Sequence, residues 1–173
     1  MSRLAAFTAV FLTFALCHVF RVRRYARASF PTGVWMDYRI DLDPTHQVLR
    51  VTVTAAVLTH DLGEDCYRSV ARIASRGGPY AAIWDLSGVT STTASTDQVR
   101  ERASSAPAVP AGRTRVVVAK EPVIYGLSRM IELMRDSMGG QSQVVHTLEE
   151  AYDLVGARPE DFTQRLFPVP IAA

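Results

Sequence analysis

The sequence predicts an α/β fold: a single mixed sheet of about five strands covered by about four helices, in the order ββαβαβαβα. Three observations carry this prediction. Apolar runs bounded by turn residues alternate with stretches of helical periodicity, which is typical of strands and helices in turn. Capping-box patterns precede three of the helical stretches. The first two strand patterns follow each other directly, which favours an antiparallel hairpin ahead of parallel crossovers.

The domain is expected to begin with the hairpin. Residues 38–43 and 49–54 alternate apolar and polar side chains, the pattern of half-buried strands, and Asp43-Pro44-Thr45-His46 between them predicts a turn. A helix is predicted over 61–74, because its apolar residues recur on one face and Asp61 and Glu64 have capping-box spacing. Gly77-Gly78 is expected to end this helix in a left-handed cap.

The rest of the chain continues the alternation. A doubly buried strand is predicted over 80–86, a short helix from Ser95 through Ala103, and a strand over 114–120. Pro122 opens a helix with the apolar stripe Ile124, Leu127, Ile131, Met134 and Met138, ended by Gly139-Gly140. A strand over 143–146 and a helix capped by Thr147 and Glu150 follow, and Gly156 ends that helix. Residues 158–173 are expected to form an irregular tail.

Charge is distributed unevenly between the leader and the domain. The net charge of +2 combines a leader, residues 1–35, that has five arginines and no acid with a remainder of net charge −3. A mildly acidic domain has no electrostatic reason to bind nucleic acid. Cys17 and Cys66 fit small buried hydrophobes in a reducing compartment, and no Cys/His spacing resembles a zinc site. No metal or other cofactor is expected.

The leader has three interpretations. Leu4 to Phe20 is uncharged for 17 residues, the lower limit for a membrane span, and the arginines after it would keep the domain at the cytoplasmic face of the inner membrane. Translation could instead start at Met36, which leaves a cytoplasmic domain. A cleaved signal peptide is the least favoured, because the arginines follow the apolar run.

Two motifs and the element order give a family resemblance. Residues 83–90 read Ile-Trp-Asp-Leu-Ser-Gly-Val-Thr, and residues 147–152 read Thr-Leu-Glu-Glu-Ala-Tyr. Residues 37–157 resemble the STAS family of anti-sigma-factor antagonists, most closely its SpoIIAA-like branch, often labelled STAS/SEC14. The resemblance implies a regulatory domain that binds a protein partner through the loop after the central strand. A second copy of the chain, in a homodimer, is one candidate partner.

In the antagonists a kinase phosphorylates the serine of an Asp-Ser pair in that loop. The resemblance places Thr93 and Ala94 at the pair, and alanine has no hydroxyl to phosphorylate. It therefore implies that this chain keeps the fold without the standard phosphoswitch. Thr93 and Ser95 flank the position and remain the phosphorylation candidates if the loop is shifted.

The hydroxyl-rich loop is the candidate binding site, because ligands of open α/β sheets bind beyond the carboxyl ends of the strands. Its candidate residues for a protein partner or a small ligand are Asp85, Ser87, Thr90, Ser91, Thr92, Thr93 and Ser95. The competing interpretation is that serine and threonine here are ordinary loop and cap residues. The function expected is non-catalytic binding.

Other functions are less favoured. His60 and Asp61 with Ser87, or Cys66 with His146, could form a catalytic group, but nothing in the sequence brings either set together. A small lipid-handling protein or enzyme could use the crevice near Asp85 and Ser87. In that case the methionines of the long helix would line a groove, although at this spacing they are more often core: Met130, Met134 and Met138. Trp84 is expected in the core.

Overall fold

A six-stranded mixed sheet in the order β7-β6-β4-β2-β1-β8 is the centre of the fold. The computed structural model describes residues 37–78, 80–110, 112–136 and 141–166. The six strands are β1 (Tyr38–Asp43), β2 (Val48–Val53), β4 (Ala81–Asp85), β6 (Arg115–Val118), β7 (Ser142–Val145) and β8 (Gln164–Leu166). The fold class is therefore α/β with a mixed sheet and four helices, as the sequence predicts.

The strand pairings explain why β4 is central. β1 and β2 form the expected antiparallel hairpin, with Ile40 opposite Val51. β2, β4, β6 and β7 are parallel, and Trp84 of β4 lies in register with Val51 on one side and Val117 on the other. β4 therefore has parallel neighbours on both edges, in agreement with its apolar, turn-bounded sequence.

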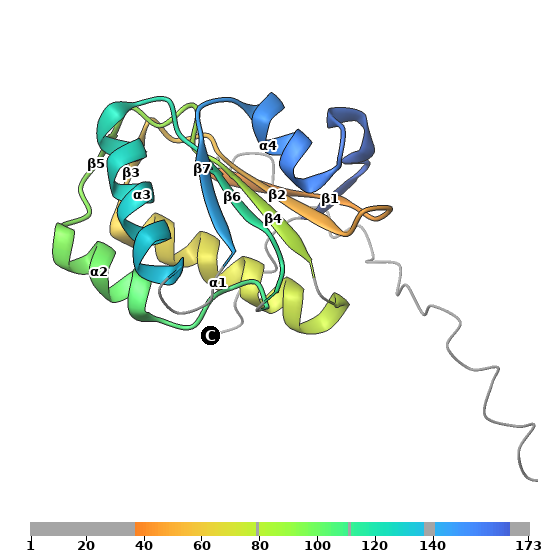
Figure 1. The fold of residues 1–173 in the computed structure, drawn as a ribbon, viewed down its shortest axis with the longest axis horizontal. Helices are drawn as coiled ribbons and strands as arrows, with labels where there is room; N and C mark the ends of the chain where they lie inside the picture. The colour runs from red at the N-terminus through yellow and green to blue at the C-terminus, as the bar shows by residue number, and fades with distance from the viewer. Residues whose placement is uncertain (1–36, 79, 111, 137–140, 167–173) are drawn as a thin grey trace, which may run out of the picture. The chain divides into compact units, whose positions relative to one another are not determined.

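Helices cover both faces of the sheet (Figure 1). One face packs against α1 (His60–Gly77), α2 (Thr96–Ser104) and α3 (Pro122–Asp136), and its core includes Leu49, Val51, Cys66, Val70 and Ile124. The other face packs against α4 (Leu148–Val155), with Val48, Ile83, Val116, Ala151 and Tyr152 in its core. Alternate side chains of β2 and β4 enter the two cores, because successive strand residues point to opposite faces.

Most of the described helix ends follow the sequence signals. α1 ends at Gly77 as predicted, but the predicted left-handed cap there is wrong, because Gly78 has φ 117° and ψ −172°. Ser95 with Gln98 and Thr147 with Glu150 form complete capping boxes, and Gly156 adopts the left-handed conformation at φ 69°. The predicted cap at Asp61 is wrong. Thr59 is extended and its side chain accepts a hydrogen bond from the Leu62 backbone N–H at 3.1 Å, so α1 begins at His60. Asp61 lies in the first turn.

The first strand is more buried than its alternation predicts. Asp41 and Asp43 are buried, because the face expected to meet solvent is covered by α4 and by the C-terminal segment. Asp41 is neutralised by Arg39, Arg50 and Arg165 at 3.2, 3.1 and 3.4 Å. Charged residues alternating with apolar ones therefore form buried ion pairs here.

The structure contains three strands that the predicted order does not include. β3 (Val57–Leu58) and β5 (Ser91–Thr92) pair in parallel as a separate two-stranded sheet. β8 pairs antiparallel with β1, with Asp41 opposite Arg165, and a 3-10 turn over Pro159–Asp161 precedes it. Residues 159–166 therefore contain a 3-10 turn and a strand, where an irregular segment was expected.

No helix among the described residues is long and apolar enough to cross a membrane. The proposed membrane segment Leu4 to Phe20 lies outside those residues, as do Cys17, Met36, Met138 and Gly139-Gly140. The three interpretations of the leader stay predictions.

Candidate ligand-binding site

The hydroxyl loop begins with a turn built on Asp85. This residue ends β4, is 5% exposed, and its Oδ1 accepts hydrogen bonds from the Ser87 backbone N–H at 3.1 Å and the Ser87 hydroxyl at 2.6 Å. An aspartate that accepts from the residue two positions on is a common turn geometry. Both candidate side chains are therefore engaged with each other at the start of the loop.

The next hydroxyls hold the small sheet and the helix that follows. Thr90 and Thr92 donate from their hydroxyls to the backbone carbonyls of Ala56 and Leu58, at 3.1 and 2.7 Å. Ser95 caps α2. Ser91 and Thr93 are exposed on the same segment. The loop's local geometry thus uses five of its seven candidate side chains in turns, caps and backbone contacts, and Ser91 and Thr93 are the two exposed hydroxyls that remain.

The side chains considered for catalysis are not joined by a hydrogen bond or ion pair in the described part of the chain. Ser87 donates to Asp85, and His146 stacks on Tyr125 with ring centres 4.3 Å apart. Cys66 is 1% exposed, and burial raises the pKa of its thiol to about 12. A buried thiol that keeps its proton is a poor nucleophile.

A cavity of about 180 Å³ lies between α1, α2, α3 and the sheet. Its walls are mostly apolar and include Leu58, Leu86, Val99, Val117, Ile131 and Val144. Trp84 of β4 also lines it, stacks on Tyr67 with ring centres 6.1 Å apart, and has a buried indole N–H without a hydrogen-bond partner. Ala94 and Val99 bring the end of the hydroxyl loop and the start of α2 to the cavity.

Gly63 leaves room in this cavity. The α1 residues that line it are His60, Gly63, Glu64 and Tyr67, which share one helical face because they are spaced three, four and seven apart. A Cβ atom built at Gly63 meets no heavy atom within 4 Å. A larger side chain at this position would therefore occupy cavity space.

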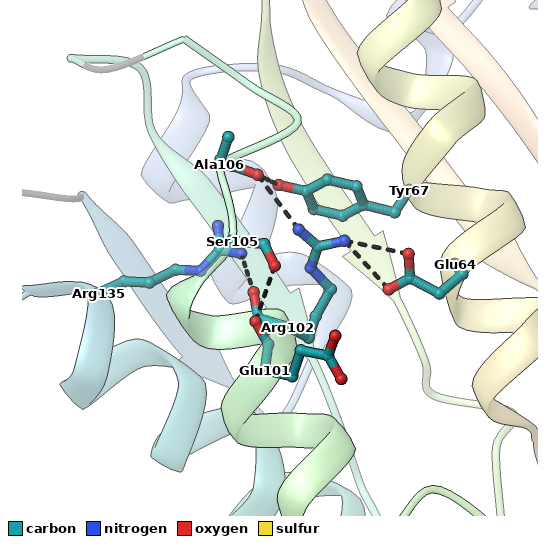
Figure 2. A network of polar contacts seen from close by, with 7 residues as sticks. All are labelled: Glu64, Tyr67, Glu101, Arg102, Ser105, Ala106 and Arg135. Carbon is teal, nitrogen blue, oxygen red and sulfur yellow. Dashed lines mark hydrogen bonds and ion pairs between the residues drawn. The ribbon is translucent and has the colours of Figure 1, made fainter.

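Arginines gather at one end of the cavity. Arg102 of α2 donates from Nη1 to both carboxylate oxygens of Glu64, at 3.1 and 3.2 Å, and from Nη2 to the Ala106 carbonyl at 3.3 Å. Its guanidinium lies over the Tyr67 ring, and the Tyr67 hydroxyl donates to the same carbonyl (Figure 2). Arg102 is therefore neutralised by Glu64 and held between α1 and the loop after α2.

Arg135 and Arg115 complete the cluster, and neither forms an ion pair with a carboxylate of the described residues. Arg135 of α3 is 5% exposed and donates from Nη2 to the Arg102 carbonyl at 2.9 Å, while its Nε and Nη1 have no partner. Arg115 of β6 donates to the Ser142 hydroxyl. Burial, followed by the positive charges of Arg135 and Arg102, lowers the pKa of Arg115 to about 10.

Aspartate and glutamate side chains do not supply a direct counter-charge for these two arginines. All 17 aspartates and glutamates of the chain are among the described residues, and no ion pair joins one of them to Arg115 or Arg135. A second cavity of about 280 Å³ shares Arg115, Arg135 and Ser142 with the first. Arg115 and Arg135 therefore line both cavities, and neither guanidinium group is paired with an aspartate or glutamate.

Sequence patterns contain a signal for this cluster that the loop-centred prediction missed. Arg135 is four residues after Ile131 on the helix face that carries Ile124, so it lies on the buried side of α3. Arg102 is three residues after the buried Val99, and Arg115 begins a strand of three valines. A charged residue at an apolar position of the pattern marks a buried charge, which needs a partner.

One group of residues has the composition of a metal site. Ligand atoms of Asp43, His46 and Asp161 lie within 4.8 Å of one another. Their oxygens are already engaged: Asp43 accepts from the Thr45 and His46 backbone N–H groups, and Asp161 accepts from the Arg158 N–H. These contacts fix the β1–β2 turn against the 3-10 segment, and they account for the cluster without an ion.

Comparison of the chain with protein-family models, with curated proteins and with solved structures found no match.

Proposed function

We propose that this domain is a non-catalytic module that binds a small, mostly apolar ligand in the cavity between α1, α2, α3 and the sheet. The observation that carries the proposal is the cavity itself, with its volume of about 180 Å³ and its apolar walls. Native interiors are close-packed and contain few voids larger than a water molecule. An unfilled apolar space of this size is typical of a binding site.

The size of the cavity sets the size of the ligand. An apolar cavity of about 150 Å³ binds benzene. A single ring with one or two substituents, or a short branched chain, matches the space here. Trp84 lines this space, and its buried indole N–H has no hydrogen-bond partner.

The STAS-like interpretation is part of this proposal. It supports a binding role, since the antagonists act by binding, and it locates that role at the loop and helix after the central strand. The cavity includes Ala94 and Val99 from that segment, whereas most of the loop hydroxyls serve turns and caps. We propose that the segment contributes apolar side chains to a ligand site and, with Ala94 at the expected serine, has no standard phosphoswitch.

Ligand-observed 19F NMR with 4-fluorotoluene, a neutral probe, tests the proposal. We expect the probe signal to broaden and shift with the wild-type chain and with Gly126→Leu, and to stay at its free position with Gly63→Leu. Both glycines lie in helices with no heavy atom within 4 Å of a built Cβ, but only Gly63 lines the cavity. Equal binding by both variants, or none by the wild type, would refute the proposal.

A further inference from the structure

We infer, on the basis of the proposed ligand site, that the ligand is a small apolar monocarboxylate whose carboxylate is held by Arg115 and Arg135. The juxtaposition that carries the inference is an apolar cavity that ends at two guanidinium groups without a carboxylate partner. The proposed function needs only the cavity. The charge of the ligand follows from the arginines.

Within the described residues, the ion pairs of the cluster do not balance its positive charge. Arg102 pairs with Glu64, whereas Arg135 donates to the carbonyl of Arg102 and lies 5.9 Å from the centre of the Tyr67 ring. Arg115 donates to the hydroxyl of Ser142, and Asp136 acts on it through its charge without forming an ion pair. Removing a charge from water is unfavourable unless the charge is paired, and breaking a buried pair leaves an uncompensated ion. A bound anion would supply the missing partner for two guanidinium groups.

The two ends of the cavity differ in a way that matches such a ligand. Leu58, Leu86 and Ala94 lie at the carboxyl end of the parallel strands, and they form an apolar end. Arg115 and Ser142 begin β6 and β7, so the cationic end lies at the amino end of those strands. An apolar body with one acidic group at its tip fits this polarity.

A carboxylate suits the cationic end better than a phosphate does. Guanidinium groups bind carboxylates through two parallel hydrogen bonds, and the Nε and Nη1 of Arg135, which have no partner and are covered by protein, would turn toward the cavity to form them. Phosphate sites commonly add the backbone N–H groups of a helix N-terminus. Here Arg102 and Arg135 lie in the last turns of α2 and α3, where the helix dipole is negative and disfavours a dianion.

Three fluorinated probes of similar size separate these possibilities: 4-fluorobenzoate, neutral 4-fluorotoluene and 4-fluorophenyl phosphate. Binding is measured by 19F NMR on the full chain, its Arg115→Gln and Arg135→Gln variants, and Arg100→Gln as a matched control. Arg100 is exposed on α2 and pairs with Asp97 away from the cavity. The wild type should bind 4-fluorobenzoate at least about tenfold more tightly than 4-fluorotoluene, as a charge-assisted bidentate contact predicts.

Each arginine variant should lose about tenfold or more in affinity for 4-fluorobenzoate while keeping 4-fluorotoluene, which also shows that the variant is folded. Arg100→Gln should bind both probes like the wild type. Binding of 4-fluorotoluene without a preference for 4-fluorobenzoate would overturn the inference and leave the proposed function standing. Tighter binding of 4-fluorophenyl phosphate would replace the carboxylate by a phosphate. Absence of binding by every probe would remove both.

Discussion

The guanidinium carbon of Arg102 lies 3.7 Å from the centre of the Tyr67 ring, and the same guanidinium forms an ion pair with Glu64 (Figure 2). Tyr67 and Glu64 belong to α1, so one arginine joins α2 to α1 across the cavity. A cation that lies on an aromatic face and pairs with a carboxylate contributes more than an exposed ion pair does, because the pair is partly desolvated.

Removal of the Glu64 charge tests this connection. Glu64→Gln leaves Arg102 without its carboxylate, and we expect the free energy of unfolding in urea to fall by about 1–2 kcal/mol, between the values for exposed and buried pairs. Asp97→Asn is the control, because it breaks the exposed Arg100–Asp97 pair of α2. That change should cost less than about 0.5 kcal/mol. Equal losses in the two variants would contradict the prediction.

Alkaline pH should destabilise the fold through Cys66. Burial raises the pKa of this thiol from 9.0 to about 12, so the folded chain keeps a proton that the unfolded chain releases. Stability is therefore fully present below pH 9 and decreases above it, by about 1 kcal/mol between pH 9 and pH 10. Burial also raises the pKa of Tyr38, which acts in the same direction.

Urea unfolding between pH 7.5 and pH 10 measures this effect, and Cys66→Ala should flatten the decrease. The lowered pKa of Arg115, about 10, has the opposite sign, since a folded base that loses its proton early gains stability above that pH. At pH 10 about half of the Arg115 side chains are charged in the folded state, so Arg115 begins to offset the decrease only near that pH. A pH profile that is unchanged in Cys66→Ala would show that another group is responsible.

The capping box of α4 should contribute measurably to stability. The Thr147 side chain accepts from the Glu150 N–H at 3.2 Å, and Glu150 Oε2 accepts in return from the Thr147 N–H. Thr147→Ala should lower the free energy of unfolding by about 1 kcal/mol, because a helix donor loses its partner. Thr96→Ala, at an exposed first-turn position of α2, is the matched control. A difference below about 0.3 kcal/mol between the two would count against the cap.

Gly63→Ala should stabilise the fold while it reduces the cavity. An alanine in a helix is favoured over glycine by about 0.5–1 kcal/mol, and a Cβ here meets no atom. Gly126→Ala in α3 should give a similar gain, measured as an increase in unfolding free energy. Weaker 4-fluorotoluene binding is expected in Gly63→Ala alone. Destabilisation by Gly63→Ala would show that the helix packs more tightly at this point.

The α/β fold could be predicted because its elements carry local signals. Ser95 with Gln98 and Thr147 with Glu150 mark helix starts within four residues of sequence, and the run that forms β4 is apolar and bounded by turns. β8 has no such signal. It pairs with β1 across more than a hundred residues, and the Arg165–Asp41 contact that accompanies the pairing is not visible in local periodicity.

The candidate site could be predicted only in part, for a related reason. The sequence places Ala94 and the start of α2 near a binding surface, and both line the cavity. The hydroxyl-rich composition of the loop predicted a binding site there. In the structure, Thr90 and Thr92 donate instead to the backbone carbonyls of Ala56 and Leu58. The arginine cluster joins α2, β6 and α3, and no pattern within one element shows that Arg102, Arg115 and Arg135 converge.

The pairing of β8 with β1 also determines where a fragment of this domain can end without exposing a strand edge. The STAS-like boundary at residue 157 would leave the outer edge of β1 with unpaired backbone groups, and unpaired strand edges recruit other chains. Such a cut would also remove Phe162, whose ring lies 4.4 Å from the Arg50 guanidinium, and Arg165, which contacts Asp41. A fragment that ends at residue 157 should therefore self-associate through β1, whereas one that extends to residue 166 keeps the edge covered.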